Sequence, residues 1–110
     1  MAITNTAIAT TNTTIYTSSG NNAITTVIVC NKIVFDPVNQ QTGSTALYLH
    51  AVPSGGSVSD TNLIVNGLPI PAGETVSFDQ EKMVLANGDT LVAKSDSPAN
   101  LVVTVSTLAV

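Results

Sequence analysis

The chain has 110 residues, of which 44% are hydrophobic and only 9% are charged, and its formal net charge is −4. This length suits one domain with its own core, and so many apolar residues with so little charge exclude a disordered chain. The only bases are three lysines. The chain therefore lacks the basic patch that nucleic acids and anionic membranes require, and we expect neither as a partner.

The low charge also predicts how the surface behaves. A free monomer usually has about a quarter of its residues charged, whereas here Thr, Ser, Asn and Gln must supply most of the polar surface. Hydroxyls and amides lose less hydration than ions when another molecule covers them. We interpret this surface as one that packs against other protein, in a homo-oligomer or another multicopy assembly.

The single cysteine, Cys30, excludes an internal disulfide and a cysteine-based metal cluster. The N-terminal residues show no basic region followed by an apolar stretch, so no signal peptide is visible. No apolar run approaches the roughly 18 residues of a membrane span. These features predict synthesis in a cytoplasm.

Residues 1–22 form a first segment that is rich in Thr and Asn and has no charged side chain. β-Branched residues favour an extended backbone, and two interpretations are open: one or two edge strands of the domain, or an arm that pairs with a neighbouring subunit. Unpaired amides and carbonyls of an extended arm are a template for strand addition. In that interpretation the candidate subunit contacts are Ile3, Thr4, Asn5 and Ile8.

Residues 23–110 are expected to form a β-sandwich domain, because short apolar or alternating runs follow one another between turn signals. The predicted strands cover 23–30, 45–52, 63–65, 75–78, 82–85, 90–94 and 101–110. Asn66-Gly67 is expected to close the third of them as a tight turn. Residues 33–35 either add a short strand or plug an end of the core, and 79–86 is the only place for a helical turn.

Seven to nine such strands predict an all-β fold, namely an antiparallel two-sheet sandwich that is immunoglobulin-like or jelly-roll-like. In the first strand, Ile24, Ile28 and Cys30 are expected on one face and Val27 and Val29 on the other, as in a central strand. The residues expected to be mostly buried are Ile28, Leu47, Leu49, Val76, Leu91, Val103 and Val105.

No set of residues has the spacing of a catalytic, cofactor-binding or metal site. His50 is the only histidine and lies inside a predicted strand, where it is interpreted as a hydrogen-bonded structural residue, because no nucleophile motif accompanies it. Cys30 is interpreted as a buried, unreactive thiol. Most of the acids fall at predicted turns, where Asp binds backbone amides, and Asp79-Gln80-Glu81 is too sparse for a calcium loop. We expect a protein that is not an enzyme and holds no cofactor.

Several strand and turn sequences resemble those of small virion proteins of tailed bacteriophages. The resemblance covers residues 23–108 and excludes 1–22 and the 32–44 connection. Its motifs are Ile24–Asn31, Leu47–Gly56, Asn62–Ile64, Ile70–Thr75, Leu85–Asp89 and Val103–Ser106. The resemblance implies an immunoglobulin-like sandwich that is displayed on a phage particle in several copies.

The function that this resemblance implies is a non-enzymatic structural role in the virion, with synthesis in the host cytoplasm. A single module with no coiled-coil or collagen-like stretch favours a capsid decoration or cement protein whose partner is the major capsid protein. The alternatives are a collar, tail or baseplate accessory protein that binds tail or collar proteins, and a carbohydrate-binding or host-binding sandwich module.

Overall fold

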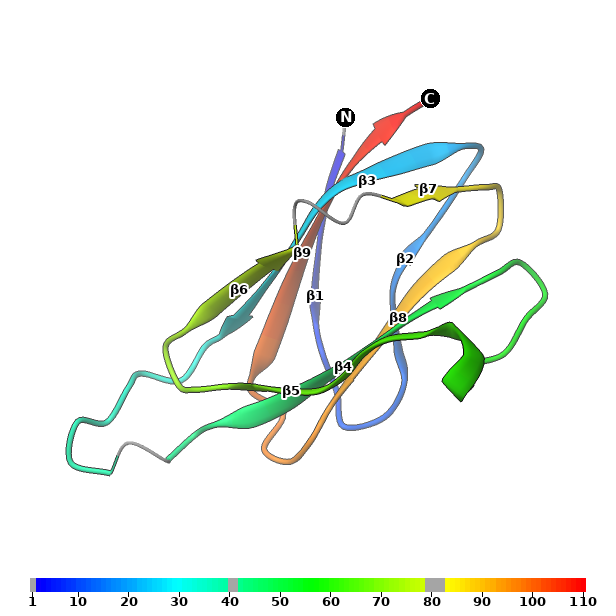
Figure 1. Ribbon diagram of the computed structural model, residues 1–110. Helices are drawn as coiled ribbons and strands as arrows, with labels where there is room; N and C mark the ends of the chain where they lie inside the picture. The colour runs from blue at the N-terminus through cyan, green and yellow to red at the C-terminus, as the bar shows by residue number, and fades with distance from the viewer. Residues whose placement is uncertain (1, 40–41, 79–82) are drawn as a thin grey trace.

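The computed structural model describes residues 2–39, 42–78 and 83–110, and it shows two antiparallel β-sheets packed face to face (Figure 1). The strands are β1 (Ala2–Ala7), β2 (Thr13–Thr17), β3 (Asn22–Asn31), β4 (Thr45–Val52), β5 (Leu63–Ile70), β6 (Thr75–Phe78), β7 (Met83–Leu85), β8 (Thr90–Ser95) and β9 (Leu101–Ala109). The prediction of an all-β, two-sheet sandwich is confirmed.

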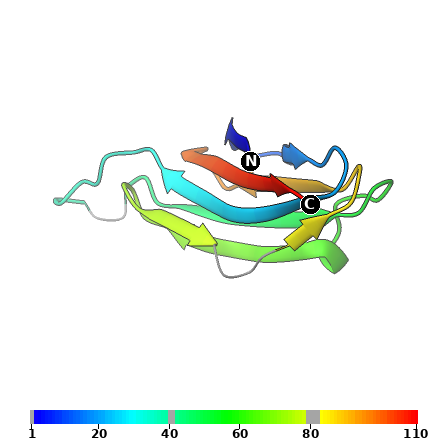
Figure 2. The same ribbon diagram turned by 90° about the horizontal axis from the view of Figure 1, so that it is seen from above.

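Sheet A has five strands in the order β1-β9-β3-β6, with β7 also paired to β3, and sheet B has four in the order β2-β8-β4-β5. Seen from above, sheet A lies in front of sheet B and their strands overlap (Figure 2). An immunoglobulin sandwich keeps its first two strands side by side in one sheet, whereas β1 and β2 lie in different sheets here. Because most connections cross between the sheets, and β6 and β7 share one position beside β3, the order is that of an eight-stranded jelly roll.

The observed geometry of strand β3 differs from the predicted core at one residue, Ile28. Its pairing with β9 shifts between Ile24 and Thr26, so the extra residue is a β-bulge that changes which side chains face inward. Ile24, Val27 and Val29 are all buried, while Ile28 is 38% exposed. The expectation that Ile28 is a core residue is therefore wrong, because strict alternation fails across the bulge.

Strand β5 corrects a second detail. Asn66-Gly67 does not end a strand, because β5 runs without a break from Leu63 to Ile70. Gly67 has a φ of 74°, and the register between β4 and β5 shifts at this point. The glycine supplies the left-handed conformation of a bulge instead of that of a hairpin turn.

The N-terminal segment belongs to the sandwich. Strand β1 pairs with β9 at the edge of sheet A, and β2 pairs with β8 at the edge of sheet B. Ile8 and Ile15 are each 2% exposed and belong to the main hydrophobic cluster. The edge-strand interpretation is the one observed, and an arm separate from a 23–110 domain is wrong because the core includes side chains from both parts.

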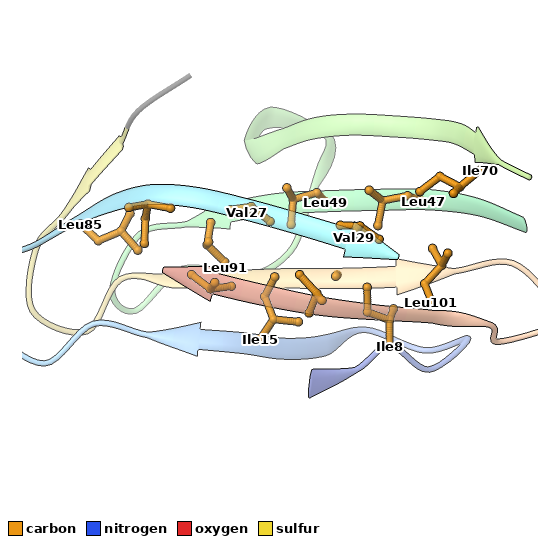
Figure 3. Close-up of a cluster of buried hydrophobic side chains, with 14 residues drawn as sticks. Ile8, Ile15, Val27, Val29, Leu47, Leu49, Ile70, Leu85, Leu91 and Leu101 are labelled. Carbon is orange, nitrogen blue, oxygen red and sulfur yellow. The ribbon is translucent and has the colours of Figure 1, made fainter. Parts of the chain in front are cut away.

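The core lies between the two sheets and is built from inward-facing aliphatic side chains of both (Figure 3). Of the residues expected there, Leu47, Leu49, Leu91, Val103 and Val105 are buried. Val76 is only partly buried and packs against the cluster from the short strand β6.

The connections also differ from expectation. Residues 33–35 form no strand, and Val34 and Phe35 are exposed on a long loop between β3 and β4. Of the expected helical region 79–86, residues 79–82 lie outside the described residues and Met83–Leu85 is strand β7. Within the described residues, one 3-10 turn, η1 (Asp60–Asn62), occurs instead in the β4–β5 connection.

Two isoleucines of the N-terminal segment give a matched test of its role. Ile8→Ala should lower the free energy of unfolding by about 2–5 kcal/mol, because it leaves a cavity in the core. Ile3→Ala should change it by less than about 0.5 kcal/mol, since that side chain is 69% exposed. Chemical denaturation of dilute protein measures both free energies of unfolding. Equal small losses of stability in the two variants would show that the segment is an arm outside the core.

Candidate interaction surface

The most unusual surface of the molecule is the outer face of sheet A, which points away from sheet B. The paired residues of an antiparallel sheet lie on the same face, so the strand registers define its members. They are Ile3, Asn5 and Ala7 of β1, Val102, Thr104, Ser106 and Leu108 of β9, Ala23, Thr26, Ile28 and Cys30 of β3, Thr75 and Ser77 of β6, and Val84 of β7.

No member of this outer face is charged. It combines small hydroxyl and amide side chains with exposed aliphatic ones, among them Ile3, Ile28, Val84 and Leu108. Neighbouring polar groups are paired: Thr104 Oγ1 donates to Asn5 Oδ1 at 2.8 Å. A sheet face of this composition costs little to desolvate and gains from apolar contact, which suits the binding of another protein surface.

The outer face of sheet B has a different character. Tyr48 and Lys94 are paired across β4 and β8 on this face, and the Lys94 ammonium lies 4.7 Å from the centre of the Tyr48 ring. The Tyr48 hydroxyl is 3.4 Å from Asp96 Oδ2. Part of this face is also covered by the β4–β5 connection, which His50 holds in place. The outer face of sheet B therefore includes a charged side chain, Lys94, whereas the members of the outer face of sheet A are all uncharged.

His50 is a structural residue in this geometry. Its Nδ1 atom lies 3.1 Å from the Ser59 carbonyl oxygen and 2.9 Å from Asn62 Oδ1. Both partners are acceptors, so Nδ1 carries the proton and donates to them. Ser59 is the N-cap of η1 and Asn62 is its last residue, and the histidine therefore fastens this turn against β4, as the sequence interpretation expected.

Cys30 is not buried in the core as expected. The bulge in β3 places it on the outer face of sheet A, where it is half-buried and its Sγ lies 3.7 Å from the Asn31 carbonyl oxygen. Of the acids, Asp36 and Asp89 do bind turn amides as predicted. Asp89 accepts from Ser54 N at 2.8 Å and from Ala86 N at 2.9 Å, so it ties the β4–β5 connection to the turn before β8.

Sequence reasoning missed the buried amide of Asn31. This side chain is 1% exposed, and its Nδ2 donates to the carbonyl oxygens of Gly43 and Ile70 at 2.7 and 2.9 Å. Its Oδ1 accepts from Ile33 N at 3.1 Å. The group anchors both ends of the β3–β4 loop. Its position two residues beyond Val29 placed it on the same face as Val27 and Val29, but both faces of this strand are apolar in the sequence, so the sequence did not show which one is inward.

Two grooves lie where β5 and the β6–β7 edge diverge. One, of about 530 Å³, is lined by Ala51, Pro53, Thr61, Asn62, Leu63, Ile64 and Met83. The other, of about 250 Å³, is lined by Val27, Leu49, Ile64, Val65, Phe78 and Met83. None of these lining residues titrates. Within the described ranges, no three His, Cys, Asp or Glu side chains lie close enough to hold a metal ion.

The four candidate contact residues of the N-terminal segment do not share one environment. Ile3 and Asn5 are exposed on the outer face of sheet A, and Thr4 is partly buried on the inward side of β1. Ile8 is in the core and cannot contact a partner with its side chain. Its assignment as a contact was wrong because the segment is a strand with an inward face.

Comparisons with protein-family models, with curated proteins and with solved structures found no match to this chain. Among the described residues, no helix is long and apolar enough to cross a membrane.

The structural role of His50 gives a second test. His50→Gln keeps an N–H donor that can reach the same acceptors, so we expect the fold, and any binding to another protein, to be retained. Thermal unfolding and a binding or incorporation assay measure the two properties. Loss of assembly with an unchanged unfolding midpoint would show that His50 belongs to a binding site.

Proposed function

We propose that this protein is a non-enzymatic structural component of a tailed-phage virion, and within that class a capsid decoration protein. The observation that carries the proposal is the uncharged outer face of sheet A, whose members come from all five strands of that sheet. The resemblance of residues 23–108 to small phage virion proteins supports the same class.

The chemistry of this face suits permanent attachment better than reversible binding of a small ligand. Ligand sites are concave and have a few converging polar groups, whereas this face is one side of a sheet and its polar groups are spread over it. Its exposed aliphatic side chains contribute apolar contact, and its hydroxyls add hydrogen bonds at low desolvation cost. A repeated capsid surface is a partner that such a face can cover.

Copy number separates the decoration role from the other virion roles. We expect quantitative mass spectrometry of purified particles to find this chain in hundreds of copies, as a surface lattice requires. About a dozen copies is the number expected for a symmetric collar or baseplate ring. That result would show that the protein is a collar, tail or baseplate component. Its complete absence from particles that carry the other virion proteins would refute the structural role.

A matched pair of substitutions tests the outer face itself. Ile28→Lys places a charge in the middle of the outer face of sheet A, where Ile28 is 38% exposed. Ile64→Lys makes the same change in sheet B, where Ile64 is 46% exposed. Because a covered unpaired charge is costly, we expect Ile28→Lys to lose incorporation into particles and Ile64→Lys to keep it, with both variants folded.

Incorporation is measured by electrophoresis of gradient-purified particles, and folding by circular dichroism of the isolated protein. The opposite pattern, with only Ile64→Lys lost, would assign the attachment to the grooves beside β5. Retention of both variants would exclude the outer face of sheet A as the attachment surface.

A further inference from the structure

We propose that β1 pairs in antiparallel fashion with β1 of a second copy of this chain, so that sheet A continues across a two-fold axis into its partner. The inference depends on the edge of sheet A and not on the outer face. It therefore stands or fails independently of the proposed attachment to a particle.

Strand β1 has one side of its backbone unpaired. Ile8 N–H donates to the Leu101 carbonyl at 2.9 Å, and hydrogen-bonded positions alternate along an antiparallel pair. The even-numbered residues of β1 therefore bond to β9, and the backbone groups of Ile3, Asn5 and Ala7 point to the open side. Within the described part of the chain, β1 pairs with no strand other than β9, so these backbone groups face no partner strand. Only another extended strand matches their spacing.

The other edges of the sandwich are protected. Strand β2 has a register shift between Thr14 and Tyr16. Strand β5 has two shifts and also Pro69. At the far edge of sheet A, β6 has four residues and β7 has three. Bulges, proline and short strands are the usual features that prevent edge pairing, and β1 has none of them: its six paired residues follow one regular register with β9.

The charge distribution favours a second copy as the occupant. A two-fold axis places side chains opposite their own equivalents, so any charge near it meets a like charge. Residues 1–31 have no charged side chain, and neither do residues 97–110 of the adjacent β9 region. Two chains of net charge −4 repel each other elsewhere, and this edge is where they approach with the least repulsion.

The geometry also fixes the register. All three residues with open backbone groups are paired when Asn5 lies opposite Asn5 of the second copy and Ile3 lies opposite Ala7 of that copy. Each of these pairs then exchanges two backbone hydrogen bonds. The side chains of Ile3, Asn5 and Ala7 lie on the outer face of sheet A, so the dimer joins the two uncharged faces into one continuous surface.

The central position of Asn5 allows a charge-exchange experiment. Asn5→Asp and Asn5→Lys each place like charges opposite each other in a homodimer, whereas a mixture of the two variants places opposite charges there. Sedimentation equilibrium should show a homodimer dissociation constant that is weakened about tenfold in each variant alone and restored in the mixture. Thr14→Asp and Thr14→Lys, at an exposed site on β2, are the matched controls and should leave it unchanged.

Cysteine cross-linking tests the register in a Cys30→Ser background. Paired residues in hydrogen-bonded positions have Cα atoms about 5.5 Å apart, which a disulfide can span, so Asn5→Cys should form a covalent dimer under mild oxidation. Ala7→Cys should not, because the two copies of residue 7 are offset by four residues, or about 13 Å along the strand.

Two results would overturn the proposal. One is a wild-type protein that stays monomeric at every attainable concentration, with no Asn5→Cys cross-link. The other is a dimer whose dissociation constant is the same in the Asn5 variants and in the Thr14 controls, since that dimer uses another surface. Circular dichroism of each variant confirms that the exposed substitutions leave the fold intact.

Discussion

The packing of the two central strand pairs against each other supports the rest of the structure. In sheet A, β3 pairs with β9 over its whole length, and in sheet B, β4 lies between β8 and β5. The inward side chains of these strands, including Val27, Val29, Leu47 and Leu49, meet in one apolar layer (Figure 3). Every other strand is added to this layer at an edge, and its stability derives from apolar surface removed from water.

A few buried polar groups determine how the ends of that layer are closed. Asn31 and Asn100 both donate to the Gly43 carbonyl, and the Ser18 hydroxyl lies 2.8 Å from the Gly20 carbonyl oxygen and 3.2 Å from that of Leu85, so its one hydrogen can be donated to either. Among the described residues, no buried side-chain nitrogen or oxygen lacks a partner. Because an unpaired buried group is costly, these amides and hydroxyls hold the loops in one arrangement and specify the jelly-roll connections.

The low number of charged residues also determines the composition of the surface. The uncharged residues 1–31 and 97–110 supply β1, β3 and β9, which are neighbours in sheet A, although β2 of sheet B also comes from residues 1–31. The charged residues within the described ranges fall instead on sheet B and on the connections. This segregation gives the molecule one face and one edge that other protein can cover at low cost, and it links the proposed attachment and the proposed dimer to a single physical cause.

The sequence by itself predicted the all-β class, because short alternating apolar runs between Gly, Pro and Asn turns favour strands that close into a sandwich or a barrel. It also determined that Leu47, Leu49, Val103 and Val105 are core residues, since this depends on local alternation, and it predicted that His50 makes hydrogen bonds within the fold, as it does. Only the tertiary structure decided the positions of Ile28, Cys30 and Asn31, because a bulge at residue 25 shifts the phase of β3 and leaves no mark in composition. It alone placed Ile8 in the core and Ile3 on the surface, and it alone made β1 an open edge. Which strands become neighbours depends on pairings between residues as distant as Ala2 and Thr107, and local sequence patterns do not encode such pairings.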